Sequence, residues 1–197
     1  MTRYRTVGIT ACIALVLGLS ACSDTAPVSR RDIAVTHNDA DVAFLQQMIP
    51  HHAQAIEMSD LVVTKSDADP QVAAQAVSIS SRQASEIEMM RGWLALWGVG
   101  PAAAQQHHPN QCGMVSSADL TALQNAGDAA ANRLYLELMI AHHAGAIKMA
   151  RTEVDAGHSR YATYFAQGII SSQQREIDVM RSMSTPGIAV DEAAPAC

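Results

Sequence analysis

Two histidine pairs flanked by methionines are the residues of this chain best suited to chemistry. The segment MIPHHAQAIEM occupies residues 48–58, and MIAHHAGAIKM occupies residues 139–149. Eight of the eleven positions are identical, at an offset of 91 residues. Imidazole nitrogens and thioether sulfurs together favour Cu(I) or Ag(I), whereas imidazole with carboxylate also accepts Cu(II) or Zn(II). The repeated segment therefore predicts a metal site, with copper as the leading candidate.

Helical spacing would place these side chains on one face. At about 100° per residue, the methionines and histidines of one segment fall within roughly a third of the helix circumference, on a stripe that also carries apolar residues. The candidate ligands are Met48, His51, His52 and Met58 in the first segment, and Met139, His142, His143 and Met149 in the second. Histidine and methionine are also ordinary core residues, so packing without a metal is the alternative.

A second repeated pattern follows each histidine segment. Q-x-x-E-I-x-x-M-R occupies residues 83–91 and again 173–181, at an offset of 90. It puts a glutamine and a glutamate on an otherwise apolar stripe, where an unpaired carboxylate would be costly to bury. These groups should meet the histidines or a metal. The residues predicted to support the ligands in this way are Gln83, Glu86, Met90, Gln173, Glu176 and Met180.

Each copy has the pattern of a helical hairpin. Asn38 or Asp39 is a suitable N-cap, Pro70 suits the first turn of a helix, and Gly98 follows the end of one. The predicted long helices cover residues 39–65, 70–97, 128–155 and 159–183, with a short helix after Ser116 or Ser117.

One hairpin alone would leave its apolar face in water, so the two copies should pack on each other. The predicted fold is all-α, an antiparallel four-helix bundle built from a duplicated hairpin. Repeat 1 covers about residues 38–97, repeat 2 about 128–183, and 184–197 form a C-terminal tail. Pro50 in the first copy is replaced by Ala141 in the second, so the two sites should be similar but not equivalent.

Composition agrees with a helical domain and excludes other classes. The chain has 197 residues, 49% of them hydrophobic but only 4% aromatic, with 10 methionines and 8 histidines. Few aromatics argue against a β-sandwich core. A net charge of -6 argues against a nucleic-acid partner, because phosphate contacts need a basic surface.

The first residues have the pattern of an export signal. Arg3 and Arg5 precede an apolar stretch over residues 7–19, which is too short to span a membrane. Leu-Ser-Ala before Cys22 resembles the lipobox of bacterial lipoproteins, in which the cysteine carries the lipid. Residues 1–21 are then a lipoprotein signal peptide and 22–37 a flexible tether. We expect an exported protein anchored by lipid to the membrane; an ordinary signal peptide with an incidental Cys22 is the alternative.

Two further cysteines remain in the exported chain, Cys112 and Cys197. Outside the cytosol such a pair can form a disulfide. Two free or intermolecularly paired thiols are the alternative.

The histidine segments, each followed by a Q-x-x-E-I-x-x-M helix, resemble the bacterial domain of unknown function 305 family over about residues 38–183. The resemblance implies a ferritin-like four-helix fold in an exported, often envelope-anchored protein. Some relatives are linked to copper binding and resistance through methionine and histidine ligands, which implies the eight candidate ligands named above.

The leading functional hypothesis is a membrane-tethered, extracytoplasmic protein that binds copper and buffers it or hands it on. We expect no enzymatic activity, because no nucleophile motif or phosphate-binding loop accompanies the glutamates. The alternative is a non-catalytic interaction module of the cell envelope, in which a buried His–Glu network specifies the core without a metal.

Overall fold

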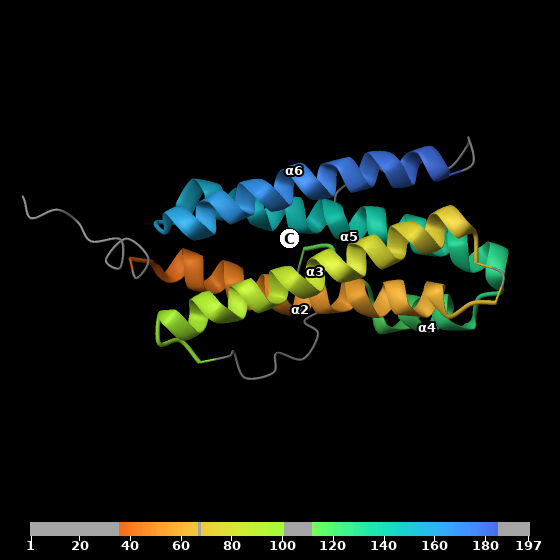
Figure 1. Ribbon diagram of the computed structural model, residues 1–197, viewed down its shortest axis with the longest axis horizontal. Helices are drawn as coiled ribbons and strands as arrows, with labels where there is room; N and C mark the ends of the chain where they lie inside the picture. The colour runs from red at the N-terminus through yellow and green to blue at the C-terminus, as the bar shows by residue number, and fades with distance from the viewer. Residues whose placement is uncertain (1–35, 67, 101–111, 185–197) are drawn as a thin grey trace, which may run out of the picture.

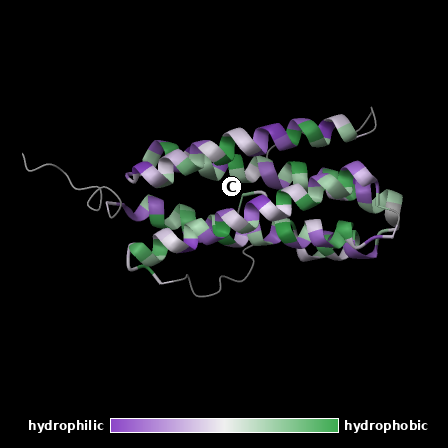
Figure 2. Cartoon of the chain, in the orientation of Figure 1, coloured by the Kyte–Doolittle hydropathy of each residue, from purple (hydrophilic) through white to green (hydrophobic). Residues whose placement is uncertain are grey.

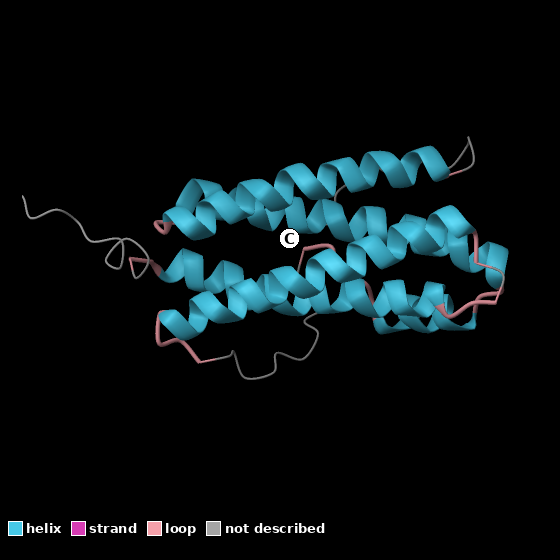
Figure 3. Cartoon of the chain, in the orientation of Figure 1, coloured by secondary structure: helices cyan, strands magenta, loops and turns pink. Residues whose placement is uncertain are grey.

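Four long helices form the body of the protein (Figure 1). The computed structural model describes residues 36–66, 68–100 and 112–184. Its long helices are α2 (Asp39–Val63), α3 (Pro70–Leu96), α5 (Asp128–Ala156) and α6 (Arg160–Met183), and the short α4 (Ser117–Asn125) packs against α2 and α5. Figure 3 shows helices and loops but no strand in this part of the chain. The predicted all-α bundle is thus confirmed, whereas the predicted signal peptide, most of the tether and the tail fall outside the described residues.

Local sequence signals explain where the helices begin. Asn38 caps α2, and its backbone N–H donates to Asp41 while Asp41 N–H donates back to its side chain, a complete capping box. Asp69 caps α3 ahead of Pro70, and Ser116 and Ser159 cap α4 and α6. Each cap satisfies backbone N–H groups that the first helical turn leaves free.

The two hairpins, α2–α3 and α5–α6, join through α2 and α5, which pack antiparallel at the centre of the bundle. The Asn38 side chain donates to the Ala156 carbonyl at one end, and Ser59 bonds Tyr135 towards the other. Between them the rings of His51 and His142 contact each other. These two histidines are equivalent positions of the repeat, so a pseudo-twofold axis passes between them.

Two apolar clusters fill the core, one on each side of the histidines. One cluster includes Met58 and Met139, and the other includes Met48 and Met149. Hydrophobic and hydrophilic residues are mixed along every helix (Figure 2), as expected for helices with one buried and one wet face.

No helix in the described ranges combines the length and the apolarity that crossing a membrane requires.

Candidate metal centre

All four histidines of the repeated segments are fully buried. His51, His52, His142 and His143 have exposed fractions of 0%, in the layer between the two apolar clusters. The ring centroids of His51 and His142 are 3.7 Å apart, with the ring planes inclined by 33°. The duplication therefore brings both predicted histidine pairs to the centre of the bundle.

Three of the rings are held from one side by an oxygen atom. Nε2 of His52 lies 2.7 Å from a carboxylate oxygen of Glu86, and Nε2 of His143 lies 2.9 Å from Glu176. Nε2 of His51 lies 3.0 Å from the carbonyl oxygen of Cys112. Ionised carboxylates and carbonyls only accept hydrogen bonds, so each Nε2 carries the proton and donates it. In each ring Nδ1 is then the nitrogen left without a partner among the described residues.

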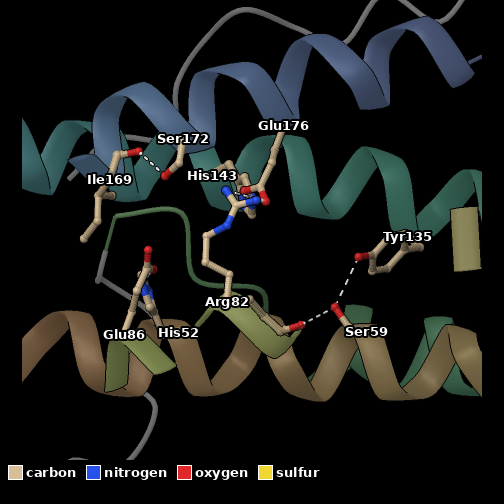
Figure 4. Close-up of polar contacts among 10 residues, drawn as sticks. His52, Ser59, Arg82, Glu86, Tyr135, His143, Ile169, Ser172 and Glu176 are labelled. Carbon is tan, nitrogen blue, oxygen red and sulfur yellow. Dashed lines mark hydrogen bonds and ion pairs between the residues drawn. The ribbon is translucent and has the colours of Figure 1, made fainter. Parts of the chain in front are cut away.

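Within the described ranges, Glu176 has a second partner and Glu86 does not. The guanidinium of Arg82 reaches from α3 across to α6 and lies 3.1 Å from the other oxygen of Glu176 (Figure 4). At the equivalent position of the second repeat, Ser172 instead donates to a carbonyl of its own helix, that of Ile169. The surroundings of Glu86 and Glu176 therefore differ.

Burial keeps the central imidazoles uncharged. Desolvation lowers the pKa of His51 to about 3, and the neighbouring His52 adds to this shift. The pKa of His142 is lowered well below its ordinary value, first by burial and then by the other histidines. Burial also lowers the pKa of His143, although Glu176 opposes the shift. At neutral pH these rings are in the uncharged form that binds metals.

Several buried polar atoms at the centre have no protein partner in the described part of the chain. Both ring nitrogens of His142 and both amide atoms of Gln83 and Gln173 belong to this set. An unsatisfied buried donor or acceptor costs about 1–3 kcal/mol. A bound ion or water is the ordinary way in which such groups are completed.

The structure does not keep the two methionines of one segment together in the way that the sequence pattern predicted. The two of each segment lie in different core clusters, and each cluster combines methionines of both repeats. Met48 and Met149 share their cluster with Met90, whereas Met58 and Met139 share theirs with Met180. This follows from the antiparallel packing of α2 and α5, which brings the start of one segment beside the end of the other.

Residues 112–115 form a cover over the histidine layer. The Gln54 side chain donates to the carbonyl of Val115 and accepts from its N–H, at 2.9 and 2.7 Å. The equivalent of Gln54 in the second copy is Gly145, where a Cβ would lie 2.3 Å from the carbonyl oxygen of Cys112. The first repeat thus binds the cover through Gln54, and the second repeat allows its close approach at Gly145. The replacement of Gln by Gly within a repeated motif is the sequence signal that could have revealed this contact.

Cys112 is disulfide-bonded. Cys197 and Cys22 lie outside the described residues, so their predicted roles stay predictions.

A buried acid pair, which the sequence patterns did not indicate, lies where α2 begins and α5 ends. Asp41 is fully buried and accepts hydrogen bonds from the backbone N–H groups of Asn38, His158 and Ser159. Glu153 is 1% exposed, and burial together with the neighbouring Asp41 raises its pKa to about 9. Two buried like charges so close together repel each other, which favours the form of Glu153 that carries a proton.

Among the described residues, no three side chains of His, Cys, Asp or Glu converge in a way that would hold a metal ion. A metal at the histidine layer would therefore require thioether ligands or a rotation of the rings. The uncharged imidazoles and the buried thioethers fit a soft ion, because both are ligands that such ions prefer.

Known structures share this fold and much of the sequence. A putative secreted protein DUF305 from Streptomyces coelicolor is 33% identical, with a TM-score of 0.68 over 73% of this chain and 89% of that one. A DUF305 fragment from Deinococcus radiodurans is 30% identical, with a TM-score of 0.68 over 74% of this chain and 95% of that one. CopM, solved in Cu(I)-bound and Cu(II)-bound forms, is 28% identical, with a TM-score of 0.61 over 73% of this chain and 94% of that one.

The comparison with curated proteins gave no match. The sequence model of the family described as a domain of unknown function (DUF305) matches residues 41–184, which covers all of the long helices except the first two residues of α2. This chain therefore belongs to the DUF305 family.

Proposed function

We propose that this protein binds copper outside the cytosol, and that it buffers the ion or hands it on without catalysing a reaction. One observation carries the proposal: three buried histidines are held at Nε2 by Glu86, Glu176 and the Cys112 carbonyl. Metal-ligating histidines almost always donate their other ring N–H to such an oxygen, which fixes the ring and raises the basicity of the free nitrogen.

The ligands that we assign are the four histidines and the four methionines, with the glutamates in support. Cu(I) is favoured over harder ions because thioethers are soft donors. The copper-bound forms of the similar protein CopM support this choice of metal. Silver and zinc are secondary candidates.

Met149 offers a connection from the site to solvent. It is 8% exposed, whereas Met48, Met58 and Met139 are fully buried. It also lines a cavity of about 210 Å³, together with Cys112 and Glu153. An ion that enters this cavity would meet a thioether before it meets a histidine.

The proposed location is the outer face of the membrane, through a lipid on Cys22. A relative described as secreted supports export, and the lipobox-like sequence supports the anchor. Mass spectrometry of the protein from membranes should find acylated Cys22 as the first residue; an unmodified chain cleaved elsewhere would contradict the anchor.

Titration of the metal-free protein with Cu(I) against a chromophoric chelator tests the proposal. Because Leu conserves the volume of Met, the variant M48L/M58L/M139L/M149L should stay folded while it loses the sulfur ligands. We expect at least a tenfold loss of Cu(I) affinity, about 1.4 kcal/mol. His51→Ala and His142→Ala should lose affinity as well.

His158→Ala is the matched control, because this exposed histidine lies outside the repeated segments. Variants that bind Cu(I) as tightly as the parent would remove the methionines and central histidines from any metal role.

The alternative is an interaction module of the envelope whose His–Glu pairs only specify the core. The pairs His52–Glu86 and His143–Glu176 favour it, since each is complete without a metal. This reading predicts a melting temperature that does not change with copper, together with loss of stability when the histidines are removed.

A further inference from the structure

A groove between α3 and α6 contains none of the proposed metal ligands, although Glu86 lies in its lining. These two helices contact each other only sparsely, and the groove between them has a volume of about 460 Å³. That size lies within the range of small-molecule sites. The lining residues that matter here are Arg82, Trp93, Tyr161, Tyr164, Phe165 and Arg175.

Aromatic side chains are concentrated at this groove. The whole chain has only eight aromatic residues, and four of them line it. Trp93 and Phe165 pack edge to face with ring centroids 5.1 Å apart, while Tyr161 and Tyr164 are 43% and 78% exposed.

The equivalent helix of the first repeat has no aromatic side chains at these positions. At the offset of 90, Tyr161, Tyr164 and Phe165 correspond to Gln71, Ala74 and Gln75 in the first repeat. Exposed aromatic side chains such as Tyr161 and Tyr164 are common on surfaces that bind another molecule.

Two cationic side chains complete the lining in a chain whose net charge is -6. Arg82 is 39% exposed and contacts Glu176 with one nitrogen. Arg175 is exposed, and among the described residues no carboxylate pairs with it. Guanidinium groups bind carboxylates through two parallel hydrogen bonds and also stack on rings. The groove also holds Glu86, but that carboxylate accepts from His52.

We propose that this groove binds a small aromatic carboxylate, with its ring against Trp93 and Phe165 and its carboxylate on Arg175. The proposal does not depend on the copper function, because none of the proposed metal ligands lines the groove.

Calorimetric titration of the purified, metal-free protein with 2-naphthoate tests the ligand class. We expect a dissociation constant on the order of 0.1–1 mM, about 4–5.5 kcal/mol. The neutral analogue 2-naphthamide should bind at least tenfold more weakly, and acetate should not bind measurably. Equal binding of the acid and the amide, or no binding of the acid, would overturn the proposal.

A steric variant tests the place of binding. A Cβ at Gly168, which lines the groove, would meet no atom within 4 Å, so Gly168→Leu should fold and fill the groove. Gly92→Leu is the matched control, because Gly92 is equally unobstructed but lies outside the groove. We expect at least a tenfold loss of 2-naphthoate binding only in the Gly168 variant; equal binding by the two variants contradicts the site.

A charge variant tests the contact between Arg175 and the ligand carboxylate. Arg175→Gln should weaken 2-naphthoate binding at least tenfold, whereas Arg133→Gln, at an exposed arginine on α5, should leave it unchanged. If both variants bind as the parent does, the carboxylate is not bound by Arg175.

Discussion

At the residue scale, one oxygen atom beside each of three buried histidines fixes the orientation of the ring and the position of its proton. Without Glu86, Glu176 and the Cys112 carbonyl, three buried imidazoles would have no fixed orientation. With them, Nε2 is the donor in each ring and Nδ1 is the free nitrogen. Since burial also lowers the pKa of His51 and His143, these rings stay uncharged at neutral pH.

The supporting carboxylates should therefore affect metal binding. Glu86→Gln and Glu176→Gln keep the side-chain shape but replace a carboxylate with a weaker, neutral acceptor. We expect each to lower Cu(I) affinity about tenfold, the lower end of the effect of such outer partners. Chelator competition measures this, with Glu88→Gln as the matched control, because Glu88 is 71% exposed and pairs with Arg91.

Equal affinities in all three glutamate variants would mean that the His–Glu pairs serve the core alone.

The acid pair at the end of the bundle should make stability depend on pH. Folding raises the pKa of Glu153 from 4.5 to about 9, so the folded state holds a proton that the unfolded state has released. This contribution is complete below about pH 4.5 and is lost as the pH rises to about 9. Denaturant unfolding should show stability falling by several kcal/mol between pH 5 and pH 9.

Glu153→Gln can donate to Asp41 without titrating, so it should flatten this slope and raise stability at pH 8. An unchanged slope in the variant would assign the pH dependence to other groups.

At the scale of elements, the two repeats differ in how they contact the cover formed by residues 112–115. Gln54 binds the backbone of Val115, and Gly145 lets Cys112 and Gly113 approach α5. Gly113 itself has φ +76°, a conformation that glycine adopts without strain. The cover thus brings one backbone carbonyl to His51 and leaves His142 without an equivalent partner.

Gly145→Ala should disturb this contact. The new Cβ would lie 2.3 Å from the Cys112 oxygen and 2.5 Å from the Gly113 Cα, both of which are backbone atoms. We expect destabilisation by about 2–3 kcal/mol in denaturant unfolding, typical of overpacking. Gly92→Ala, at an unobstructed helical position, should instead stabilise by roughly 0.5–1 kcal/mol.

If both alanine variants unfold alike, the cover is not held against α5 in solution.

At the scale of the whole molecule, the duplication brings its two histidine pairs together in one layer instead of keeping them apart. The pseudo-twofold axis passes between His51 and His142, so equivalent residues meet at the centre. The repeats differ around this point through Arg82, Ser172 and the cover, and the aromatic groove departs further from the symmetry.

The disulfide should connect the cover to the end of the chain. Peptide mapping of the exported protein without reduction should find Cys112 joined to Cys197. This bond would close a loop of roughly 85 residues and stabilise by about 4–5 kcal/mol in the chain-entropy model. A Cys112–Cys22 peptide would contradict both this pairing and lipidation of Cys22.

The helices, the duplication and the candidate ligands could all be predicted from local sequence patterns. The predicted helix ends lie within two residues of the observed ones, because Asn38, Pro70 and Ser159 act through backbone groups only a few residues away. Eight identical positions in eleven likewise required no knowledge of packing. The partners Glu86 and Glu176 could be expected because an unpaired carboxylate on an apolar stripe is costly.

Which of these residues meet depends on how the helices pack against one another. The regrouping of the methionines depends on the antiparallel register of α2 and α5, and the carbonyl of Cys112 reaches His51 across 61 residues. The raised pKa of Glu153 arises from its burial beside Asp41, which lies on an element far away in sequence. Helix periodicity fixes the face on which a side chain lies, but the register between helices is set by the packing of the whole core.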